Sequence, residues 1–282
     1  MLFEVKGLTK DYGRFKLDNV SFSLDEGYIM GFIGRNGAGK TTTIKSMLDL
    51  VRRDGGEVFF EGKDFFENET ESKRHLGVVF GEFNCYMQSK LRDITEVTKR
   101  FYSEWDDIKY RDYLAEFELD DQKKVKELSA GMRVKYALAL ALSHNAKLLI
   151  LDEPTSGLDP VSRDDLLNVF RSVVEDGTRS ILFSTHIISD LEKCADYITY
   201  IKDGKVYESS DVESFRDGYR LISGDKDDLD RLKDHILGYK ENAFGFTGLI
   251  KKEALPLFDG VKQAPADLES IMIYVEKEDK HE

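Results

Sequence analysis

The sequence has few cysteines and no long hydrophobic run. Its 282 residues include two cysteines, Cys85 and Cys194, which cannot form a disulfide framework and lack the spacing of metal ligands. No apolar stretch approaches the roughly 20 residues that cross a bilayer, and the densest is ALALAL at 137–142. The first residues, MLFEVKGLTKDYG, lack the basic-then-apolar pattern of a signal peptide. These absences predict a protein of the reducing cytosol without a membrane span of its own.

Positive charge is also scarce. The chain has 41 Lys and Arg against 54 Asp and Glu, so its formal net charge is −13. An acidic chain is poorly suited to bind nucleic acid through phosphates, and we expect no nucleic-acid partner. We find no internal repeat, no low-complexity segment and no sustained heptad pattern. The length suits one large globular domain, or one with a small appendage.

Short strands and helices alternate along residues 1–210. Strand patterns occur in FEVKGLTKDY, NVSFSL, YIMGFI, GGEVFFEG, KLLIL and RSILFS, and NVSFSL places Val20, Phe22 and Leu24 on one face. Helical patterns occur in TTTIKSMLDLV, over residues 89–119, in RVKYALALAL and over residues 160–176. A helix of that length between two buried strands predicts a parallel unit with a crossover, hence an α/β fold. DYITYIKDGKVYES predicts a closing hairpin that turns at DG.

The composition changes after about residue 211. YRLISG, DKDDLDRLKDHI, AFGFTGLI and ADLESIMIYVEK predict a strand, a helix, further strands and a last helix, so residues 211–282 are expected to form a small α+β accessory domain. The last helix would bury Leu268, Ile271, Met272 and Val275. No candidate site stands out in this domain.

A glycine-rich turn carries the first chemical motif. GRNGAGKT, residues 34–41, fits the P-loop pattern G-x-x-x-x-G-K-[ST], follows the strand YIMGFI and begins a helix, which is the context that this motif requires. The glycines allow backbone N–H groups to surround phosphate oxygens. Lys40 supplies a point charge to the outer phosphates, and the hydroxyl of Thr41 can bind Mg²⁺. The candidate nucleotide-binding residues of this turn are Gly34, Arg35, Asn36, Gly37, Ala38, Gly39, Lys40, Thr41 and Thr42.

An apolar strand that ends in two carboxylates carries the second motif. In LLILDEP, residues 148–154, Asp152 can hold Mg²⁺ and Glu153 can orient or deprotonate an attacking water. An acidic pair after a strand is by itself often a solvated turn, and the P-loop is what favours the catalytic interpretation.

LSAGM, residues 128–132, lies between a charged run and the helix RVKYALALAL. Small residues at a helix start expose backbone N–H groups, which favours an anion there. The alternative is an ordinary helix cap.

The P-loop, LSAGM, LLILDE, SGLD and STH occur in this order, and together they resemble the ATP-binding subunit of a bacterial ABC transporter over roughly residues 1–210. The resemblance implies a P-loop ATPase with a RecA-like parallel-sheet core, an antiparallel β subdomain and a helical subdomain at about residues 82–143. It implies ATP and Mg²⁺ as cofactors. It also implies two subunits that pair head to tail, either as a homodimer or with a sister ATPase.

The resemblance assigns roles to single residues. Ser129 and the backbone of Gly131 would contact the γ-phosphate held by the opposing P-loop, with Ala130 in place of a usual glycine. Tyr12 matches the aromatic that stacks on adenine, or else is a plain strand tyrosine. Asp159 matches a residue that contacts the other subunit and also fits a helix N-cap before Pro160. His186 matches the histidine that contacts the γ-phosphate.

One position departs from the family pattern. Gly81 stands where the family usually has a glutamine that contacts Mg²⁺ and signals to the membrane subunit. Glu82, the next residue, is a candidate metal ligand in its place; the alternative is that this loop contacts no metal. Glu153 and His186 are present, so we expect hydrolysis to persist.

The resemblance also implies a partner. A chain of this family without its own span energises an integral-membrane permease from the cytoplasmic face of the membrane, and the helical insert is where the family receives that subunit. The short insert, KELSAGMR and the tail helix are most similar to bacterial exporters of drugs, antibiotics and antimicrobial peptides. Lipid or polysaccharide export remains an alternative. So do a regulatory subunit that binds nucleotide without hydrolysing it, and a soluble ABC ATPase unconnected with transport.

Overall fold

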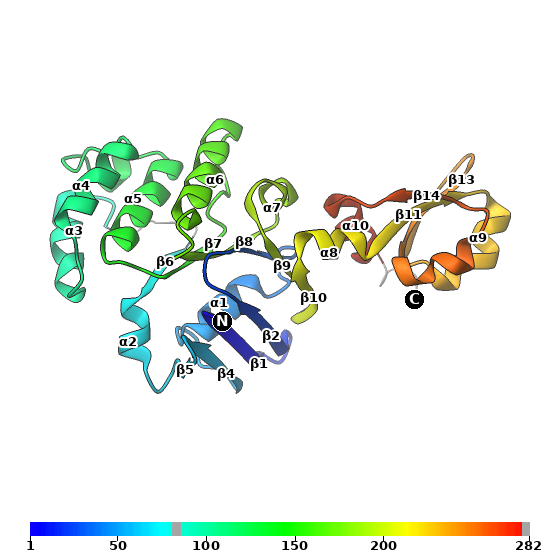
Figure 1. Ribbon diagram of the computed structural model, residues 1–282, viewed down its shortest axis with the longest axis horizontal. Helices are drawn as coiled ribbons and strands as arrows, with labels where there is room; N and C mark the ends of the chain where they lie inside the picture. The colour runs from blue at the N-terminus through cyan, green and yellow to red at the C-terminus, as the bar shows by residue number, and fades with distance from the viewer. Residues whose placement is uncertain (81–85, 278–282) are drawn as a thin grey trace. The chain divides into compact units, whose positions relative to one another are not determined.

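The computed structural model describes residues 1–80 and 86–277 and divides the chain into two compact units, Met1–Tyr207 and Glu208–Glu282 (Figure 1). The sequence placed this boundary after residue 210. Among the described residues, no helix is both long enough and apolar enough to cross a membrane.

A six-stranded sheet forms the centre of the first unit, with the strand order β10-β9-β3-β8-β7-β6. The pairs from β9 to β6 are parallel, and Asp152 at the end of β7 lies opposite Ser184 of β8. The strands are β3 (Ile29–Ile33), β6 (Leu76–Phe80), β7 (Leu148–Asp152), β8 (Ser180–Thr185), β9 (Tyr197–Lys202) and β10 (Lys205–Asp211). All residues of β3, β7 and β8 are buried, because both faces of this sheet are covered. The predicted crossover is confirmed, since α6 (Pro160–Val174) connects β7 to β8.

A four-stranded antiparallel sheet lies on one side of the central sheet, with α1 (Lys40–Met47) between them (Figure 1). Its strands are β1 (Phe3–Asp11), β2 (Lys16–Leu24), β4 (Gly55–Phe60) and β5 (Lys63–Asp64). Val20, Phe22 and Leu24 of β2 are buried, as the alternation of NVSFSL predicted. They share one core with Ile44 of α1 and Ile150 of β7. Because α1 packs between the two sheets, the position of the turn before Lys40 is fixed.

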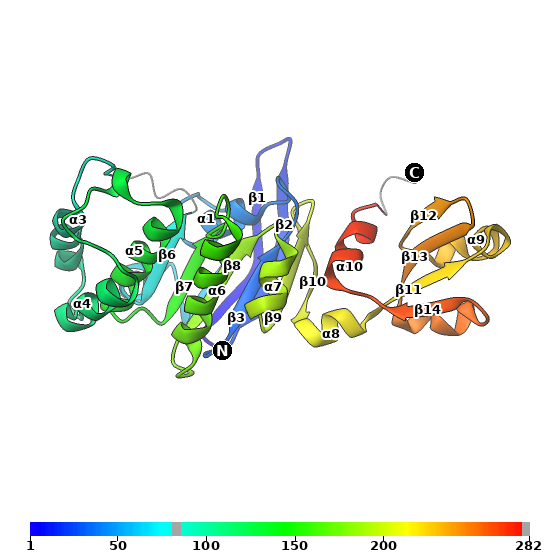
Figure 2. The same ribbon diagram turned by 90° about the horizontal axis from the view of Figure 1, so that it is seen from above.

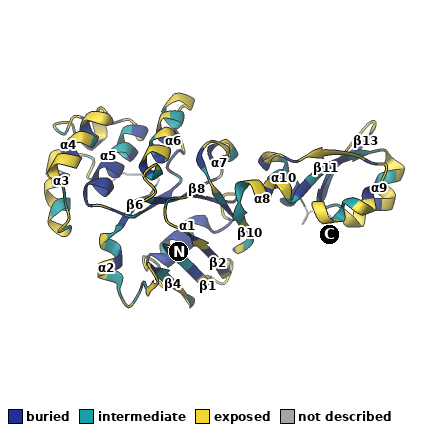
Figure 3. Cartoon of the chain, in the orientation of Figure 1, coloured by how far each residue is buried: buried dark blue, intermediate teal, exposed yellow. Residues whose placement is uncertain are grey.

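Helices cover the opposite face of the central sheet (Figures 1 and 2). They are α5 (Ala130–Ser143), α6 and α7 (Ile188–Cys194), while α2 (Glu69–Arg74) precedes β6. The predicted helical subdomain contains α3 (Leu91–Thr98), η1 (Lys99–Phe101), α4 (Asp107–Glu116), η2 (Val125–Glu127) and α5. Oγ1 of Thr95 lies 2.8 Å from the hydroxyl of Tyr110 and 3.0 Å from that of Tyr136, which joins α3, α4 and α5 in a buried polar contact. The outer surfaces of α3 and α4 are exposed (Figure 3).

The second unit contains a sheet of strand order β12-β13-β11-β14. Its elements are α8 (Val212–Asp217), β11 (Tyr219–Gly224), α9 (Lys226–Leu232), η3 (Lys233–His235), β12 (Gly238–Asn242), β13 (Gly245–Lys251), η4 (Lys252–Phe258), β14 (Lys262–Pro265) and α10 (Leu268–Val275). The predicted α+β order and the burial of Leu268, Ile271, Met272 and Val275 are confirmed. Ile222, Leu229, Phe246 and Phe258 form part of the core of this unit.

Two turns show how the local sequence ends an element. The helix predicted over TTTIKSMLDLV stops at Met47, because Asp49 has a positive φ of 56° and the N–H of Leu50 bonds back to the carbonyl of Lys45 at 2.9 Å. The predicted hairpin turn is confirmed at Asp203 and Gly204, whose φ values of 47° and 78° suit a two-residue turn of this handedness.

Candidate nucleotide-hydrolysis site

A cavity of about 330 Å³ opens where β3, β7 and β8 end. The crevice outside the carboxyl ends of parallel strands is the usual ligand site of such sheets. The residues that line it are Phe15, Arg35, Asn36, Gly37, Gly39, Lys40, Thr41, Thr42, Glu153, Ser156 and His186. The sequence named all of these residues except Phe15 and Ser156.

The turn between β3 and α1 has the geometry that the glycine pattern predicts. Gly37 and Gly39 have φ values of 86° and 114°, which a residue with a side chain adopts only with strain. A Cβ on Gly34 would lie 2.4 Å from the carbonyl oxygen of Ile201, so this glycine permits close packing against β9. Ala38 is buried behind the turn. The backbone is thereby free to face the cavity.

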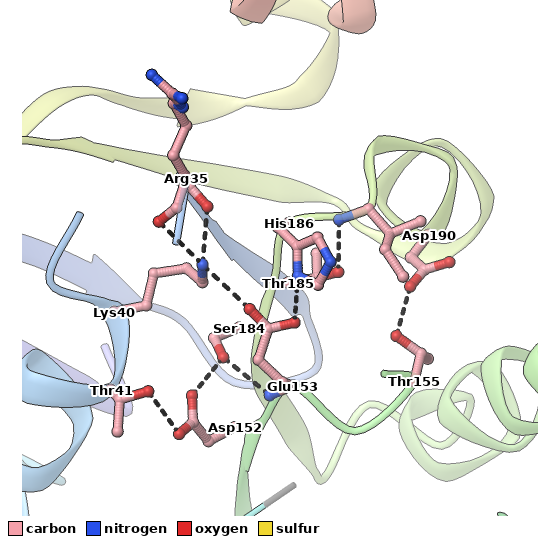
Figure 4. Close-up of polar contacts among 12 residues, drawn as sticks. Arg35, Lys40, Thr41, Asp152, Glu153, Thr155, Ser184, Thr185, His186 and Asp190 are labelled. Atoms are coloured by element: carbon pink, nitrogen blue, oxygen red, sulfur yellow. Dashed lines mark hydrogen bonds and ion pairs between the residues drawn. The ribbon is translucent and has the colours of Figure 1, made fainter. Parts of the chain in front are cut away.

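Lys40, the first residue of α1, has a side chain only 5% exposed. Its Nζ donates to the carbonyl oxygen of Gly34 at 2.7 Å and to that of Arg35 at 3.3 Å. It also lies 3.0 Å from Oε1 of Glu153 (Figure 4). A buried ammonium held in this way is a fixed positive charge at the wall of the cavity.

Glu153 is held from two sides. Its Oε1 pairs with Lys40, and its Oε2 lies 2.8 Å from Nδ1 of His186 (Figure 4). The backbone of Glu153 has a positive φ of 52°, and its N–H donates to the hydroxyl of Ser184 at 2.9 Å. This left-handed conformation costs a non-glycine residue about 1–3 kcal/mol, and the hydrogen bond to Ser184 helps to hold it. The turn after β7 therefore aims this carboxylate at the cavity.

Thr41 and Asp152 are brought together as the sequence predicted. Oγ1 of Thr41 donates to Oδ2 of Asp152 at 2.8 Å, and the hydroxyl of Ser184 donates to Oδ1 at 2.6 Å (Figure 4). Hydroxyl and carboxylate oxygens are the donors that hard cations prefer, and Mg²⁺ usually takes one or two of them from the protein with the rest from phosphates and water. The residues present therefore fit a nucleotide-bound cation.

Ser129 is the N-cap of α5, and its Oγ accepts a hydrogen bond from the N–H of Met132 at 3.2 Å. Ser129 and Ala130 are exposed, while Gly131 is buried. A Cβ on Gly131 would contact Leu158 and Ser162 at 3.7 Å, so the start of α5 lies against the start of α6. None of these residues lines the cavity, and their role opposite another subunit stays a prediction.

Asp159 is the N-cap of α6. Its carboxylate accepts from the N–H groups of Val161 and Ser162 and from the Ser162 hydroxyl at 2.6 Å. The hydrogen bonds from Ser162 hold the pKa of Asp159 below its usual value. The capping role that the sequence suggested is confirmed, and its role between subunits stays a prediction.

The aromatic residue in the cavity is Phe15, not Tyr12. Tyr12 does not line the cavity; it is 53% exposed, and its ring lies 5.3 Å from Nζ of Lys10. Phe15 lies beside Gly39, whose added Cβ would be 3.0 Å from the ring. Adenine stacking by Tyr12 stays a prediction, and Phe15 is a further aromatic wall. Gly81 and Glu82 lie outside the described residues, so Glu82 as a metal ligand is also still a prediction.

Ser184 was not predicted as a site residue, although it lies in the quoted STH motif. This serine contacts both Asp152 and Glu153, because β7 and β8 are neighbours in register. The signal that could have found it is a polar residue inside a strand of otherwise buried type, RSILFS. The sequence alone does not show that β8 lies beside β7, so it could not predict that Ser184 contacts Asp152 and Glu153.

Known proteins resemble most of this chain in sequence. The family model described as ABC transporter matches residues 17–156. The bacitracin transport ATP-binding protein BcrA of Bacillus licheniformis is 33% identical over 214 residues, which are 73% of this chain and 69% of that protein. The lantibiotic transport ATP-binding protein SrtF of Streptococcus pyogenes is 33% identical over 208 residues, which are 73% of this chain and 89% of that protein.

Solved structures give the same picture of the fold. A solved ATP-binding subunit of an ABC transporter superimposes with a TM-score of 0.69 at 27% identity, over 77% of this chain and 92% of that one. A bacterial ABC transporter cassette solved as a dimer gives a TM-score of 0.66 at 24% identity, over 75% and 99%. At this identity the second likeness concerns the fold alone.

Proposed function

We propose, from the premise that this chain belongs to the ATP-binding subunits of ABC transporters, that it uses MgATP to drive export of an antimicrobial peptide or similar drug through a separate membrane permease. ATP binding and hydrolysis are properties of the family, and its ATP-binding subunits form dimers and work with permeases. The cation, this chain's own partner and the cargo are the proposed part. The observation that carries the proposal is Glu153, held between Lys40 and His186 at the cavity.

Lys40 and the amides of the P-loop hold the phosphates in this proposal. Lys40 pairs with Glu153 in the structure, and a triphosphate, which carries more charge than one carboxylate, competes for it. Glu153 remains hydrogen-bonded to His186 and is then placed to orient or deprotonate the attacking water. His186 fixes the direction of the carboxylate and lies within the same cavity.

Magnesium is proposed to bind between Thr41 and Asp152. When bound there, Mg²⁺ neutralises charge on the outer phosphate oxygens. Residues 1–80 and 86–277 contain no group of three or more His, Cys, Asp or Glu side chains that could hold a metal by themselves. The cation is therefore expected to bind with the nucleotide and not before it.

A second subunit is proposed to complete the site. Ser129 is exposed at the start of α5, where the first N–H groups of a helix have no partner within the helix and attract an anion. We propose that this end of α5 closes over the γ-phosphate bound by the opposing subunit and that Asp159 lies at the same contact. Binding then closes the dimer, and product release opens it.

The membrane partner is proposed to bind a groove on the helical subdomain. This groove has a volume of about 490 Å³ and is lined by Tyr86, Ser89, Asp93, Ile94, Val97, Thr98, Phe101 and Tyr102. Tyr86 and Phe101 are more than 70% exposed, which is unusual for clustered aromatic side chains and typical of a protein-binding surface. A cytoplasmic helix of the permease is the proposed occupant, and it would hold the chain at the cytoplasmic face of the membrane.

The names of the relatives support the cargo. BcrA is described as a bacitracin transport protein and SrtF as a lantibiotic transport protein. Both names describe the transport of an antimicrobial peptide. They give no support to a regulatory subunit without hydrolysis or to an ATPase unconnected with transport, so these alternatives are not favoured.

The first experiment measures the mass in solution of the Glu153→Gln variant with and without ATP, beside the ATPase activity of the wild type. We expect ATP to convert the variant from monomer to dimer and the wild type to turn over. Adding Ser129→Arg to the variant should prevent the dimer while leaving ATP binding intact. ATP binding with neither dimer nor turnover would contradict the proposed mechanism for the isolated chain.

A further inference from the structure

Asp190 is a buried carboxylate that the proposed mechanism does not use. It lies in the first turn of α7, four residues after His186, and its side chain is 0% exposed. Burial of a carboxylate without full pairing costs stability, so the position of Asp190 calls for a reason. Figure 4 shows it beside the turn that carries Glu153.

Thr155 joins this carboxylate to the turn after β7. The hydroxyl of Thr155 donates to Oδ2 of Asp190 at 2.6 Å, and both side chains are buried. Thr155 follows Glu153 by two residues, with Pro154 between them, so little of the chain is free to move independently. The hydrogen bond therefore links the segment of Glu153 to the helix that follows His186.

Arg163 faces the other oxygen of the same carboxylate. Its Nε lies 4.0 Å from Oδ1 of Asp190, which is an ion-pair distance but too long for a hydrogen bond. Neither Nε of Arg163 nor Oδ1 of Asp190 has any hydrogen-bond partner, and both atoms are buried. Arg163 also lies near the start of α6, four residues after the cap Asp159.

The groups around Asp190 offset only part of the unfavourable effect of burial on its ionised carboxylate. Burial raises the pKa of Asp190, while the hydroxyls of Thr155 and Thr185 and the charges of Arg163 and Lys193 act to lower it. A small movement of α6 toward α7 would give Oδ1 and Nε the hydrogen bond that both lack, which is worth more for a charged pair than for a neutral one.

We infer that Asp190 is a positioning residue for hydrolysis: it ties the Glu153 turn, the start of α6 and the His186 segment to one buried carboxylate, so that these three parts move together. This inference rests on the proposed function, because it presumes that Glu153 and His186 act on one bound nucleotide. Asp190 itself does not line the cavity.

The test compares Asp190→Asn with Asp164→Asn. The asparagine can still accept the hydrogen bond of Thr155 but removes the charge that faces Arg163. Asp164 is the matched control, because its carboxylate also bridges α6 to α7, through Lys193 at 2.6 Å, but on the surface. We expect Asp190→Asn to lower kcat about tenfold or more with less than a threefold change in KM for MgATP, and Asp164→Asn to change neither.

A double variant separates positioning from a general loss of structure. If Asp190 acts through His186 and Glu153, Asp190→Asn should lower kcat by less than threefold in a His186→Ala background. A full and additive loss in that background, or a wild-type kcat in Asp190→Asn alone, would overturn the inference. Thr155→Val removes only the hydrogen-bond donor and replaces Asp190→Asn as the test if that variant does not fold. It should also lower kcat with little change in KM.

Hydrogen exchange gives a readout that does not need turnover. Asp190→Asn should speed amide exchange in residues 155–163 and 186–194 at least threefold while leaving α1 unchanged. A wild type that binds ATP without hydrolysing it would refute the proposed function, whereas unchanged exchange in the variant would refute the positioning role of Asp190.

Discussion

The hydroxyl of Ser184 lies 2.6 Å from Oδ1 of Asp152, and the two residues lie opposite each other at the ends of neighbouring parallel strands. The same hydroxyl accepts the N–H of Glu153 at 2.9 Å. One serine thus holds both the carboxylate proposed to bind the cation and the backbone of the residue proposed to be catalytic. Because Ser184 lies at the end of its strand, it can contact the side chain of Asp152 and the backbone of Glu153 at the same time.

Ser184→Ala should therefore weaken the site without removing any residue that touches nucleotide. Asp152 is 6% exposed, and loss of a buried hydrogen bond to such a group is expected to lower the free energy of unfolding by about 1–3 kcal/mol. We also expect ATPase activity to require a higher Mg²⁺ concentration. Denaturant unfolding and a Mg²⁺ titration of turnover measure the two effects. Ser172→Ala, at an exposed position of α6, should change neither.

His186→Ala should separate turnover from binding. The substitution removes the group that holds Oε2 of Glu153, so kcat is expected to fall by about 10²–10⁴-fold. The affinity for MgATP should stay within a few-fold, because Lys40 and the P-loop are untouched. Steady-state kinetics and nucleotide titration measure these effects, with His235→Ala in the second unit as the control. An equal loss of affinity and of kcat would count against the assigned role.

Gly34→Ala should disturb the P-loop through a contact outside the cavity. Its Cβ would lie 2.4 Å from the carbonyl oxygen of Ile201 and 2.9 Å from its Cγ2, so either β9 or the loop must shift. We expect a lower melting temperature and at least a tenfold loss of nucleotide affinity. Gly55→Ala has no positive φ, and the nearest atom to its Cβ is 3.9 Å away, so this control should be tolerated. Similar behaviour of the two variants would show that the packing of Gly34 is unimportant.

His144 should make stability depend on pH. It is 4% exposed and stacked on Tyr102, with ring centroids 3.7 Å apart. Burial lowers the pKa of His144 to about 4, below its value of about 6.5 in an unfolded chain. Between these two pKa values the unfolded state therefore binds more protons than the folded state. The stability that neutral His144 contributes is fully present above pH 6.5 and is lost as the pH falls toward 4. The loss due to this residue is about 2 kcal/mol between pH 7 and pH 5.

The measurement is denaturant unfolding at pH 7 and pH 5 for the wild type and His144→Phe. Phenylalanine keeps a ring against Tyr102 but does not titrate. The variant should therefore lose less stability than the wild type on acidification, by about the amount given above. Glu71, Arg74, His75 and Glu104 line the same small cavity and are common to both proteins. Parallel pH profiles would show that His144 does not carry the effect.

Phe101→Glu should prevent the chain from binding its proposed membrane partner. Phe101 is 72% exposed in the groove of the helical subdomain and does not line the cavity of the nucleotide site. We expect ATPase activity of the isolated chain to stay within twofold and copurification with the permease to be lost. Ile108→Glu is the control, since Ile108 is 66% exposed on α4 but does not line the groove. Retention of the permease by Phe101→Glu would place the contact elsewhere.

The sequence predicted those parts of the site that are formed by residues next to one another in the chain. A P-loop holds phosphates with successive backbone groups, so GRNGAGKT alone specifies most of the cradle. Asp152 and Glu153 follow from one buried strand in the same way. The strand pattern also predicted the crossover, because helix and strand lengths leave few other arrangements.

Residues that act across strands or helices were not predictable from their own surroundings. Ser184 matters because β8 lies beside β7, and Phe15 because its loop lies against Gly39. The sequence alone does not distinguish Asp190 from other acidic residues of its helical segment, whereas its contacts with Thr155 and Arg163 do. The proposed dimer contacts of Ser129 and Asp159 depend on a second chain, so the structure of one chain cannot place them.

Strand β10 has a consequence for anyone who wishes to study the ATPase unit alone. It runs from Lys205 to Asp211 and so continues past the end of the first compact unit at Tyr207. It is also the outermost strand beside β9, whose residues 198–201 are all buried. Cutting the chain after Tyr207 would shorten this cover and leave backbone groups of an apolar strand unpaired, which invites intermolecular strand pairing and aggregation. A chain ended after Asp211 keeps the strand whole and should stay monodisperse.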